Sequence, residues 1–244
     1  MLKNNLNVII IAVAIITSSY LFSNAFQNRN KNTDTISVTG LGKTDFVSDL
    51  IVWNGSFSRK SSTLKEAYAS LDADRDKIKS YLSSKGIAPN EIVFSAVNFN
   101  KEYQSTYNEN GTLRENIFTG FSLTQSVSIQ SKEVNKIEEL SRQSSELINS
   151  GIEFYSSAPE YYYTKLAELK IKMIAEATKD ASTRAKSIAE NADASLGNLK
   201  KSDMGVFQII GQNSSEDYSY GGSFNTQSKN KTATITVKLV YQVD

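Results

Sequence analysis

The chain has 244 residues, which is enough for one large domain or two small ones. Its 27 Lys and Arg residues nearly balance its 26 Asp and Glu residues, so no bulk charge draws it toward nucleic acid or an anionic surface. It contains no histidine and no cysteine, which excludes His-dependent nucleophile triads, thiol chemistry and the common zinc and copper sites.

The first segment of the chain is apolar. There is no charged residue between Lys3 and Arg29, and Leu6–Phe26 just supplies the roughly 20 mostly apolar residues that a membrane anchor needs. A cleaved signal peptide is the alternative, with Ser23-Asn24-Ala25 as the small residues before the cut. We therefore expect residues 1–28 to be a signal anchor or a signal peptide. Either one places the folded part outside the cytoplasm, anchored to the membrane or secreted to the periplasm.

A short polar stretch separates this segment from the folded part. Residues 29–35 are poor in apolar side chains and predict a tether, and residues 36–244 are expected to form one α+β domain. Alternating side chains predict a strand over Ile36–Gly40 and a second strand over Leu50–Ser58.

A helix and a third strand follow. The helix is expected to begin at the capping box Thr63-x-x-Glu66 and to end at Gly86-Ile87, where glycine suits a left-handed cap. Its apolar stripe consists of Leu64, Tyr68, Leu71, Ile78 and Leu82. The strand covers Ile92–Phe99.

The order of strand, Ser or Thr cap, helix, Gly-Ile stop and strand then occurs again. Phe121–Ile129 alternate as a strand, Ser131 is expected to cap the next helix, and Gly151-Ile152 ends it. The stripe of this helix consists of Val134, Ile137, Leu140, Leu147 and Ile148. Two such units, joined by a hairpin that turns at Asn108–Gly111, predict the βαββαβ order of a ferredoxin-like sheet with helices on one face.

A long helix is predicted next. Ser157-Ala158-Pro159-Glu160 has the pattern of a capping box with Pro in the first turn, and Leu196-Gly197 marks the change to a strand. Its face is predicted from Leu166, Lys170, Met173, Ala177, Ala181, Ile188 and Ala192, with a close-packing strip of Ala175, Ala177, Ala181, Ala185 and Ala189.

The chain is expected to close with a β-hairpin. A strand lies near residues 200–211, a long flexible loop over 212–229, and an alternating strand runs from Ala233 to Val243. The predicted fold is thus a ferredoxin-like βαββαβ unit extended by a long Ala-rich helix and a C-terminal β-hairpin, preceded by an apolar helix.

Four motifs suggest chemistry, and each has a simpler interpretation. Gly42-Lys43-Thr44 lacks the rest of a phosphate loop and is interpreted as a turn. Asp72-x-Asp74-x-Asp76 lacks the Gly and Glu of a calcium loop and is interpreted as a solvated helix face. Ser62-x-x-Lys65 is interpreted as part of a helix cap, and Tyr161-Tyr162-Tyr163 as packing at a helix start. We predict no catalytic, cofactor-binding or metal-binding residues and no cofactor.

With these elements placed, the chain resembles the SIMPL family of exported bacterial proteins. The features that carry the resemblance are Ile36-Ser37-Val38-Thr39-Gly40-x-Gly42, Gly86-Ile87 with Glu91-Ile92, Gly120-Phe121, Gly151-Ile152, the Ala177/Ala181/Ala185/Ala189 ladder, Leu196-Gly197 and the closing strand. The sequence departs by having Ser48-Asp49 where Pro-Asp is usual in the family. The resemblance implies an envelope protein of poorly defined molecular role, linked to stress tolerance, and it brings no catalytic residues.

Two functional hypotheses from different classes remain. The first is a non-catalytic envelope protein that assembles into a homo-oligomer through sheet edges, Ala faces and the Tyr161-Tyr162-Tyr163 cluster. The second is a hydrolase of envelope polymers that works through carboxylates, although no carboxylate pair can be identified from spacing. No nucleic-acid partner is expected. The first hypothesis is favoured because the common catalytic groups are missing.

Overall fold

The structure is a computed structural model that describes residues 2–29 and 34–243, with the side chains of residues 10–26 and 34–243. It is a mixed α+β structure, as predicted, and its strands form two sheets. In chain order the elements are α1 Leu2–Arg29, β1 Thr35–Val47, β2 Leu50–Ser61, α2 Leu64–Ser84, the 3-10 helix η1 Pro89–Glu91, β3 Ile92–Phe94, β4 Asn98–Tyr107, β5 Leu113–Ser131, α3 Val134–Gln143, α4 Glu146–Asn149, β6 Phe154–Ser156, β7 Glu160–Tyr162, α5 Leu166–Asn191, β8 Leu196–Met204, β9 Gln208–Gly211, β10 Ser223–Phe224 and β11 Asn230–Val243.

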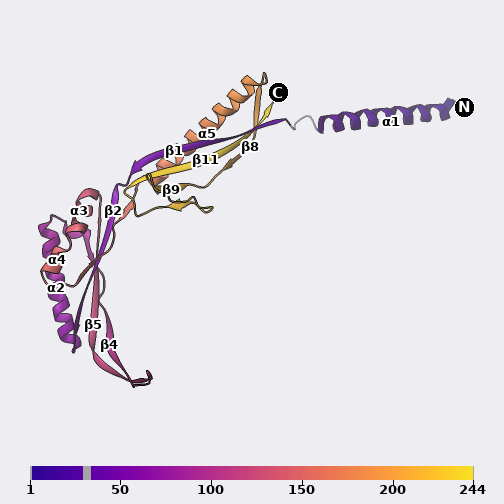
Figure 1. Cartoon of the computed structure of the whole chain (residues 1–244). Helices are drawn as coiled ribbons and strands as arrows, with labels where there is room; N and C mark the ends of the chain where they lie inside the picture. Colours follow the sequence, from indigo (N-terminus) through magenta and orange to yellow (C-terminus); the bar gives the residue numbers. More distant parts are fainter. Residues whose placement is uncertain (1, 30–33, 244) are drawn as a thin grey trace.

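The expected N-terminal helix is present as α1, which lies apart from both sheets (Figure 1). Its described large apolar side chains are exposed on every side, from Val13 at 57% to Phe22 at 78%. Among the helices that the structure describes, none is long and apolar enough to cross a membrane. The tether predicted at residues 29–35 is shorter than expected, because Arg29 belongs to α1 and Thr35 to β1. Residues 30–33 lie outside the described residues.

One sheet, which we call the α2 sheet, has the strand order β3-β5-β2-β6, with β4 also paired to β5 and β7 to β2. All of its described neighbours are antiparallel. Ile51, Trp53 and Phe57 of β2 share one face, as predicted, and all three are at most 1% exposed. They form a single core with α2, α3 and α4, so the two helical units of the repeat share one apolar interior.

The second sheet, which we call the α5 sheet, has the order β1-β11-β9-β10, with β8 also paired to β11. The closing strand β11 pairs antiparallel with β8 and β9, as the predicted C-terminal hairpin requires, but it also pairs with β1 and therefore lies inside this sheet. Its register with β1 runs without interruption from Thr35↔Gln242 to Val47↔Asn230. Contact between the first and last strands of a fold cannot be deduced from alternation along either one.

Helix α5 covers the α5 sheet through small side chains. Ala177, Ala181 and Ala185 are fully buried, which confirms the predicted strip. A side chain at Gly40 of β1 would collide with the backbone carbonyl oxygen of Ala177, and one at Gly42 would lie 2.6 Å from that of Met173. Strand and helix backbones therefore approach each other directly, and glycine at these two positions permits it.

The predicted start of this helix was wrong. Residues 157–160 form no capping box: α5 begins at Leu166, and Glu160–Tyr162 form strand β7 against β2. The N–H of Tyr161 donates to the carbonyl oxygen of Thr226, 2.7 Å away, and that of Ser157 to Asn54. Pro159 disfavours helical geometry in the residue before it, and pairing with β2 overrides the local cap pattern.

Several predicted stripe positions were also wrong. Leu64 and Tyr68 of α2, Ile148 of α4, and Ala175, Ile188 and Ala192 at α5 are exposed. Thr63 does cap α2, with its hydroxyl accepting from the Glu66 N–H at 3.3 Å. Ser131 instead accepts from the N–H of Glu133, the residue that precedes α3.

Candidate functional site

The chain passes from one sheet to the other at Ser48-Asp49, between β1 and β2 (Figure 1). Three further segments meet there: the start of β11, strand β7 and helix α3. The Ser48 N–H donates to the carbonyl oxygen of Lys229 at 2.9 Å, and the Asp49 N–H to that of Tyr162 at 3.1 Å. We call this place, defined by Ser48, Asp49, Tyr161, Lys229 and Lys231, the junction.

Lys231 is the most unusual residue of the junction. It is 1% exposed, and its ammonium Nζ donates to the carbonyl oxygen of Tyr161 at 2.7 Å and to Ser48 Oγ at 3.0 Å. Burial lowers the pKa of Lys231 to about 8, and the carboxylate of Glu216 opposes that shift. A buried amine with neutral partners is costly, so its position indicates a specific role in joining the two sheets.

Two carboxylates accept hydrogen bonds at the junction. Burial alone would raise the pKa of Asp49, but the Thr164 hydroxyl at 2.6 Å and N–H at 2.7 Å donate to it and lower that pKa. The Lys229 ammonium donates to Glu138 of α3 at 2.8 Å, and this hydrogen bond lowers the pKa of Glu138. The Glu138 contact joins the start of β11 to the helical layer of the α2 sheet.

The side chains of the three consecutive tyrosines pack within the molecule. Tyr161 is 7% exposed, and burial raises the pKa of its hydroxyl. The Tyr162 ring lies 6.5 Å from that of Phe224, and the Tyr163 ring lies 4.9 Å from that of Phe46. The interpretation as packing is thus confirmed, but at strand β7 and not at a helix start.

The only chemistry that this geometry suggests is that of a nucleophile next to a base. A serine hydroxyl 3.0 Å from a lysine amine resembles an activated Ser–Lys pair. However, Ser48 is 4% exposed and Lys231 1%, and the amine is already held by the Tyr161 carbonyl. No substrate reaches Ser48 Oγ while the junction is closed, so the arrangement fits a structural joint.

The other candidate motifs lie elsewhere. Gly42-Lys43-Thr44 is neither a phosphate loop nor the turn that was expected, because it lies within strand β1. Ser62 precedes Thr63, which is the residue that caps α2. Within the described residues no cluster of three or more acidic side chains could hold a metal ion.

Asp74 corrects the interpretation of the acidic triplet. Asp72 is half-buried and Asp76 exposed, but Asp74 is 1% exposed and paired with Arg59 of β2. The Arg59 Nη2 group donates to Asp74 Oδ1 at 2.9 Å and to the Gly151 carbonyl oxygen at 2.7 Å. The sequence carried a signal for this burial, since residue 74 lies between Leu71 and Ile78 on the apolar stripe.

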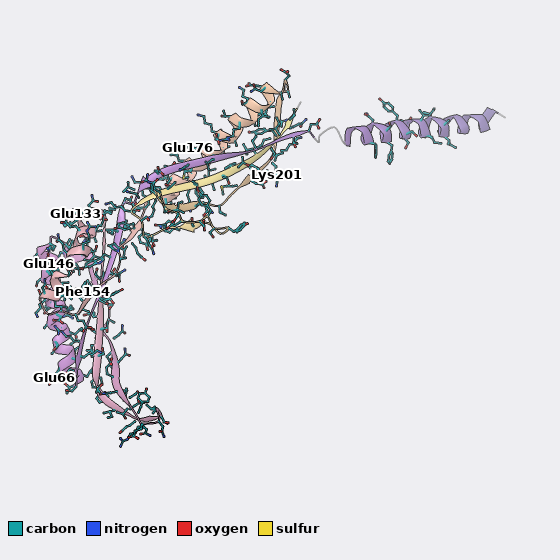
Figure 2. The ribbon with its side chains drawn as sticks, in the orientation of Figure 1. Glu66, Glu133, Glu146, Phe154, Glu176 and Lys201 are labelled. Atoms are coloured by element: carbon teal, nitrogen blue, oxygen red, sulfur yellow. The ribbon has the colours of Figure 1, made fainter. Side chains whose placement is uncertain are left out.

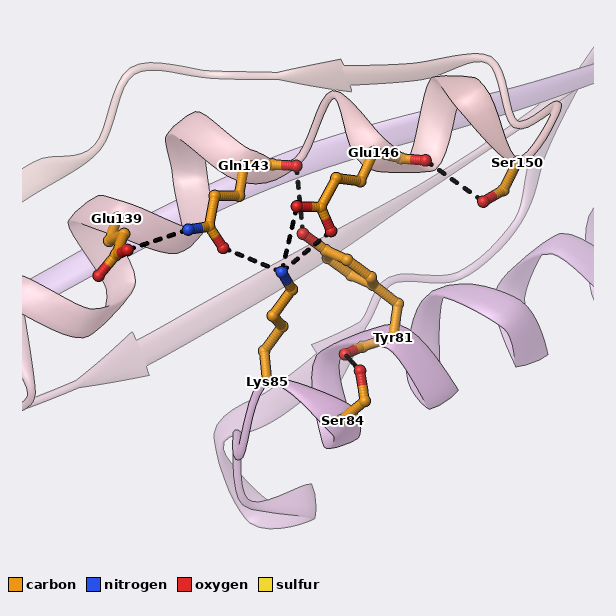
Figure 3. A network of polar contacts seen from close by, with 7 residues as sticks. All are labelled: Tyr81, Ser84, Lys85, Glu139, Gln143, Glu146 and Ser150. Atoms are coloured by element: carbon orange, nitrogen blue, oxygen red, sulfur yellow. Dashed lines mark hydrogen bonds and ion pairs between the residues drawn. The ribbon is translucent and has the colours of Figure 1, made fainter.

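A polar network at the far end of α2 fastens it to α3 and α4 (Figure 3). The Lys85 ammonium donates to Gln143 Oε1 at 2.9 Å and pairs with Glu146 Oε2 at 2.9 Å. The hydrogen bond to Glu146 raises the pKa of Lys85, and burial raises the pKa of Tyr81 beside it. This network stabilises the helical layer and leaves its groups engaged with one another.

Two of the surface hollows that lie away from the junction are mainly apolar. One of about 510 Å³ is lined by Leu41, Val206, Gln208, Tyr218, Tyr220 and neighbouring residues of β11. The other, of about 520 Å³, is an apolar groove between the start of α2 and strands β4 and β5, lined by Leu64, Lys65, Tyr68, Val97, Phe99 and Leu123.

Comparison with known proteins identifies the family. No curated protein matches the chain. The model of the SIMPL family, described as proteins of unknown function (DUF541), matches residues 36–241, which cover both sheets and all of their helices. The chain therefore belongs to the SIMPL family.

Proposed function

We propose that this chain is a non-catalytic protein of the cell envelope that assembles with further copies of itself. The observation that carries the proposal is the exposure of large apolar side chains at both ends of the molecule, on α1 and on the ribbon of β4 and β5 (Figure 2). Exposed apolar surface of this extent marks contact with a membrane or with another protein.

Helix α1 supports a place in the envelope. Its described apolar side chains, such as Ile16 at 69% and Phe22 at 78% exposure, have no core of their own to enter. We infer that this segment directs export and holds the chain at the membrane unless it is cleaved. The folded part then lies outside the cytoplasm. The link to stress tolerance remains an expectation drawn from the resemblance.

The surfaces for which the sequence suggested self-assembly make contacts within the chain instead. The Ala strip of α5 faces β1, the tyrosine cluster packs at the junction, and β11 is paired on both sides. The edge of β1 is blunted, because Asp180 of α5 accepts the N–H of Leu41 at 2.9 Å. The support for assembly therefore comes from the ribbon of β4 and β5.

We also propose that the α2 sheet has the ferredoxin-like topology. Its four positions are filled in chain order by β2, then β3 and β4, then β5, then β6 and β7. The spatial order β3-β5-β2-β6, antiparallel throughout, is what two interleaved βαβ units produce. The α5 sheet is then an addition to that unit, and the junction is the point of attachment.

One preparation of the full-length chain tests location and assembly together. Cell fractionation should place the protein in the envelope, and mass spectrometry of its N-terminus decides between a retained and a cleaved segment. Light scattering in detergent at micromolar concentration should give a mass well above that of one chain. A cytoplasmic protein would refute the envelope role, and a monomer at every concentration would refute self-assembly.

A further inference from the structure

The ribbon of β4 and β5 continues past the start of α2, where none of the described helices covers it (Figure 1). Paired residues of antiparallel strands point to the same side. Leu123 pairs with Phe99 and is buried under α2, so its side of the ribbon is the core side. Farther out, the same side carries Tyr103 opposite Phe118 and Tyr107 opposite Leu113.

This side lies in open solvent and is mostly apolar, with the polar side chains of Lys101, Ser105 and Asn116 between its apolar ones. We call it the aromatic face; it consists of Phe99, Tyr103, Tyr107, Leu113, Phe118 and Phe121. The rings are in contact along it, with Phe118 5.2 Å from Phe121 and 5.7 Å from Tyr103. Tyr107 is 64% exposed. The other side is polar apart from Ile117, with Glu102, Gln104, Thr106 and Glu115 among its residues.

We propose that the aromatic face is the self-association surface, and that its occupant is the aromatic face of a second copy, turned antiparallel about a two-fold axis. This inference rests on the self-assembly proposed above and names the surface that performs it.

The spacing of the apolar rungs supports a two-fold axis. Phe99, Tyr103 and Tyr107 follow one another at four-residue steps along β4, about 13 Å apart. An axis that lies between the two faces, along the rung of Tyr103 and Phe118, would place Tyr107 of each copy over Phe99 of the other. The adjoining apolar groove, about 520 Å³ in volume, offers space for those side chains.

The two rungs between the apolar ones also face each other under this axis. The rung of Lys101 and Phe121 would face the rung of Ser105 and Asn116 of the second copy. Asn116 Oδ1, which accepts from the Ser105 hydroxyl at 2.7 Å within one chain, is an acceptor for the Lys101 ammonium. An isologous interface requires this kind of self-complementarity.

The size of the surface is also suitable. Aromatic side chains offer about 150–250 Å² each, so this half-exposed set leaves on the order of 500 Å² per copy. Two copies would bury about 1,000 Å², near the lower limit for a specific interface. A membrane is the less suitable occupant, because the tip of the ribbon is the polar turn Asn108–Gly111 and carries Glu109.

The absence of cysteine from the sequence allows a direct test on the full-length chain. Tyr103→Cys should be joined into covalent dimers by a bis-maleimide of about 10 Å reach, which is the distance between facing sheets. Gln104→Cys, next along β4 on the polar side, is the matched control and should stay uncoupled. A mixture of Phe99→Cys and Tyr107→Cys chains should give more dimer than either variant alone.

A second measurement tests affinity. Tyr103→Asp should weaken association at least tenfold in light scattering, whereas Gln104→Asp should not, and both should keep the wild-type circular dichroism because both positions are exposed. An oligomeric wild type with no Tyr103→Cys dimers would overturn the inference while leaving self-assembly intact. A monomeric wild type would overturn both. A monomer that binds lipid vesicles through Tyr103 would show that the face is a membrane surface.

Discussion

Lys231 shows how one residue can join two parts of a fold at an energetic cost. It lies two and four residues before Ala233 and Ile235 on β11, so its side chain is on the same buried face of the strand. Its partners Ser48 and Tyr161 lie 183 and 70 residues away in sequence. A lysine in phase with an apolar stripe was the only available signal, and it could not reveal which groups the amine would meet.

The buried amine predicts a specific pH dependence. With a pKa of about 8 in the folded state and about 10.4 when unfolded, the unfolded chain binds more protons between these values. Stability should therefore rise with pH across this window, by about 3 kcal/mol at most. Between pH 7 and pH 9.5, the free energy of unfolding measured in urea should rise more for wild type than for Lys231→Met. Lys238→Met, an exposed lysine of the same strand, should behave as wild type; an equal gain in all three proteins would contradict the prediction.

The Arg59–Asp74 pair is the second residue-scale prediction. Arg59→Met should destabilise the protein by about 3 kcal/mol, because it leaves the Asp74 carboxylate buried without its main partner. The double variant Arg59→Met with Asp74→Leu should recover most of that loss, since two apolar side chains replace both charges. Denaturant unfolding of both variants measures the difference. A double variant as unstable as the single one would show that the pair is not the cause.

At the scale of elements, packing faces and the hairpin of β4 and β5 could be predicted, whereas pairings between segments distant in sequence could not. The periodic spacing of apolar residues predicted α2, α3 and the Ala strip of α5, because a helix with one buried face has apolar residues at regular intervals. Glu160–Tyr162 had a helix-start pattern, yet it became a strand because β2 offered it an edge. The position of β11 was likewise decided by β1, which lies at the opposite end of the sequence.

The contact of α5 with β1 gives a prediction at this scale. Ala181→Leu should lower stability by about 1–3 kcal/mol, because the helix lies directly on Gly40 and has no room for a longer side chain. Ala175→Leu, an exposed position on the same helix, is the matched control and should change stability little. Chemical denaturation of the two variants compares them. Equal midpoints would mean that the Ala strip does not carry the contact.

At the scale of the whole molecule, two separate cores are held together by a small polar junction. One core lies under α2 and α3, the other under α5. The links between them include the continuous chain at Ser48-Asp49, the Lys231 contacts, the Asp49–Thr164 bonds, the Lys229–Glu138 pair, and the backbone hydrogen bonds and ring contacts of residues 161–163. A molecule built in this way should unfold as one unit only while those links hold.

The last prediction follows from this arrangement. Wild-type protein should unfold in a single calorimetric transition, whereas the double variant Asp49→Ala with Lys229→Met should unfold in two, because it removes the bonds to Thr164 and Glu138. In the variant, the van't Hoff enthalpy should fall below the calorimetric enthalpy. Lys136→Met is the control, since its ion pair with Glu133 lies within one core layer and does not cross the junction. If the double variant still unfolds in one transition, the remaining contacts of the junction transmit cooperativity, and the two sheets form a single folding unit.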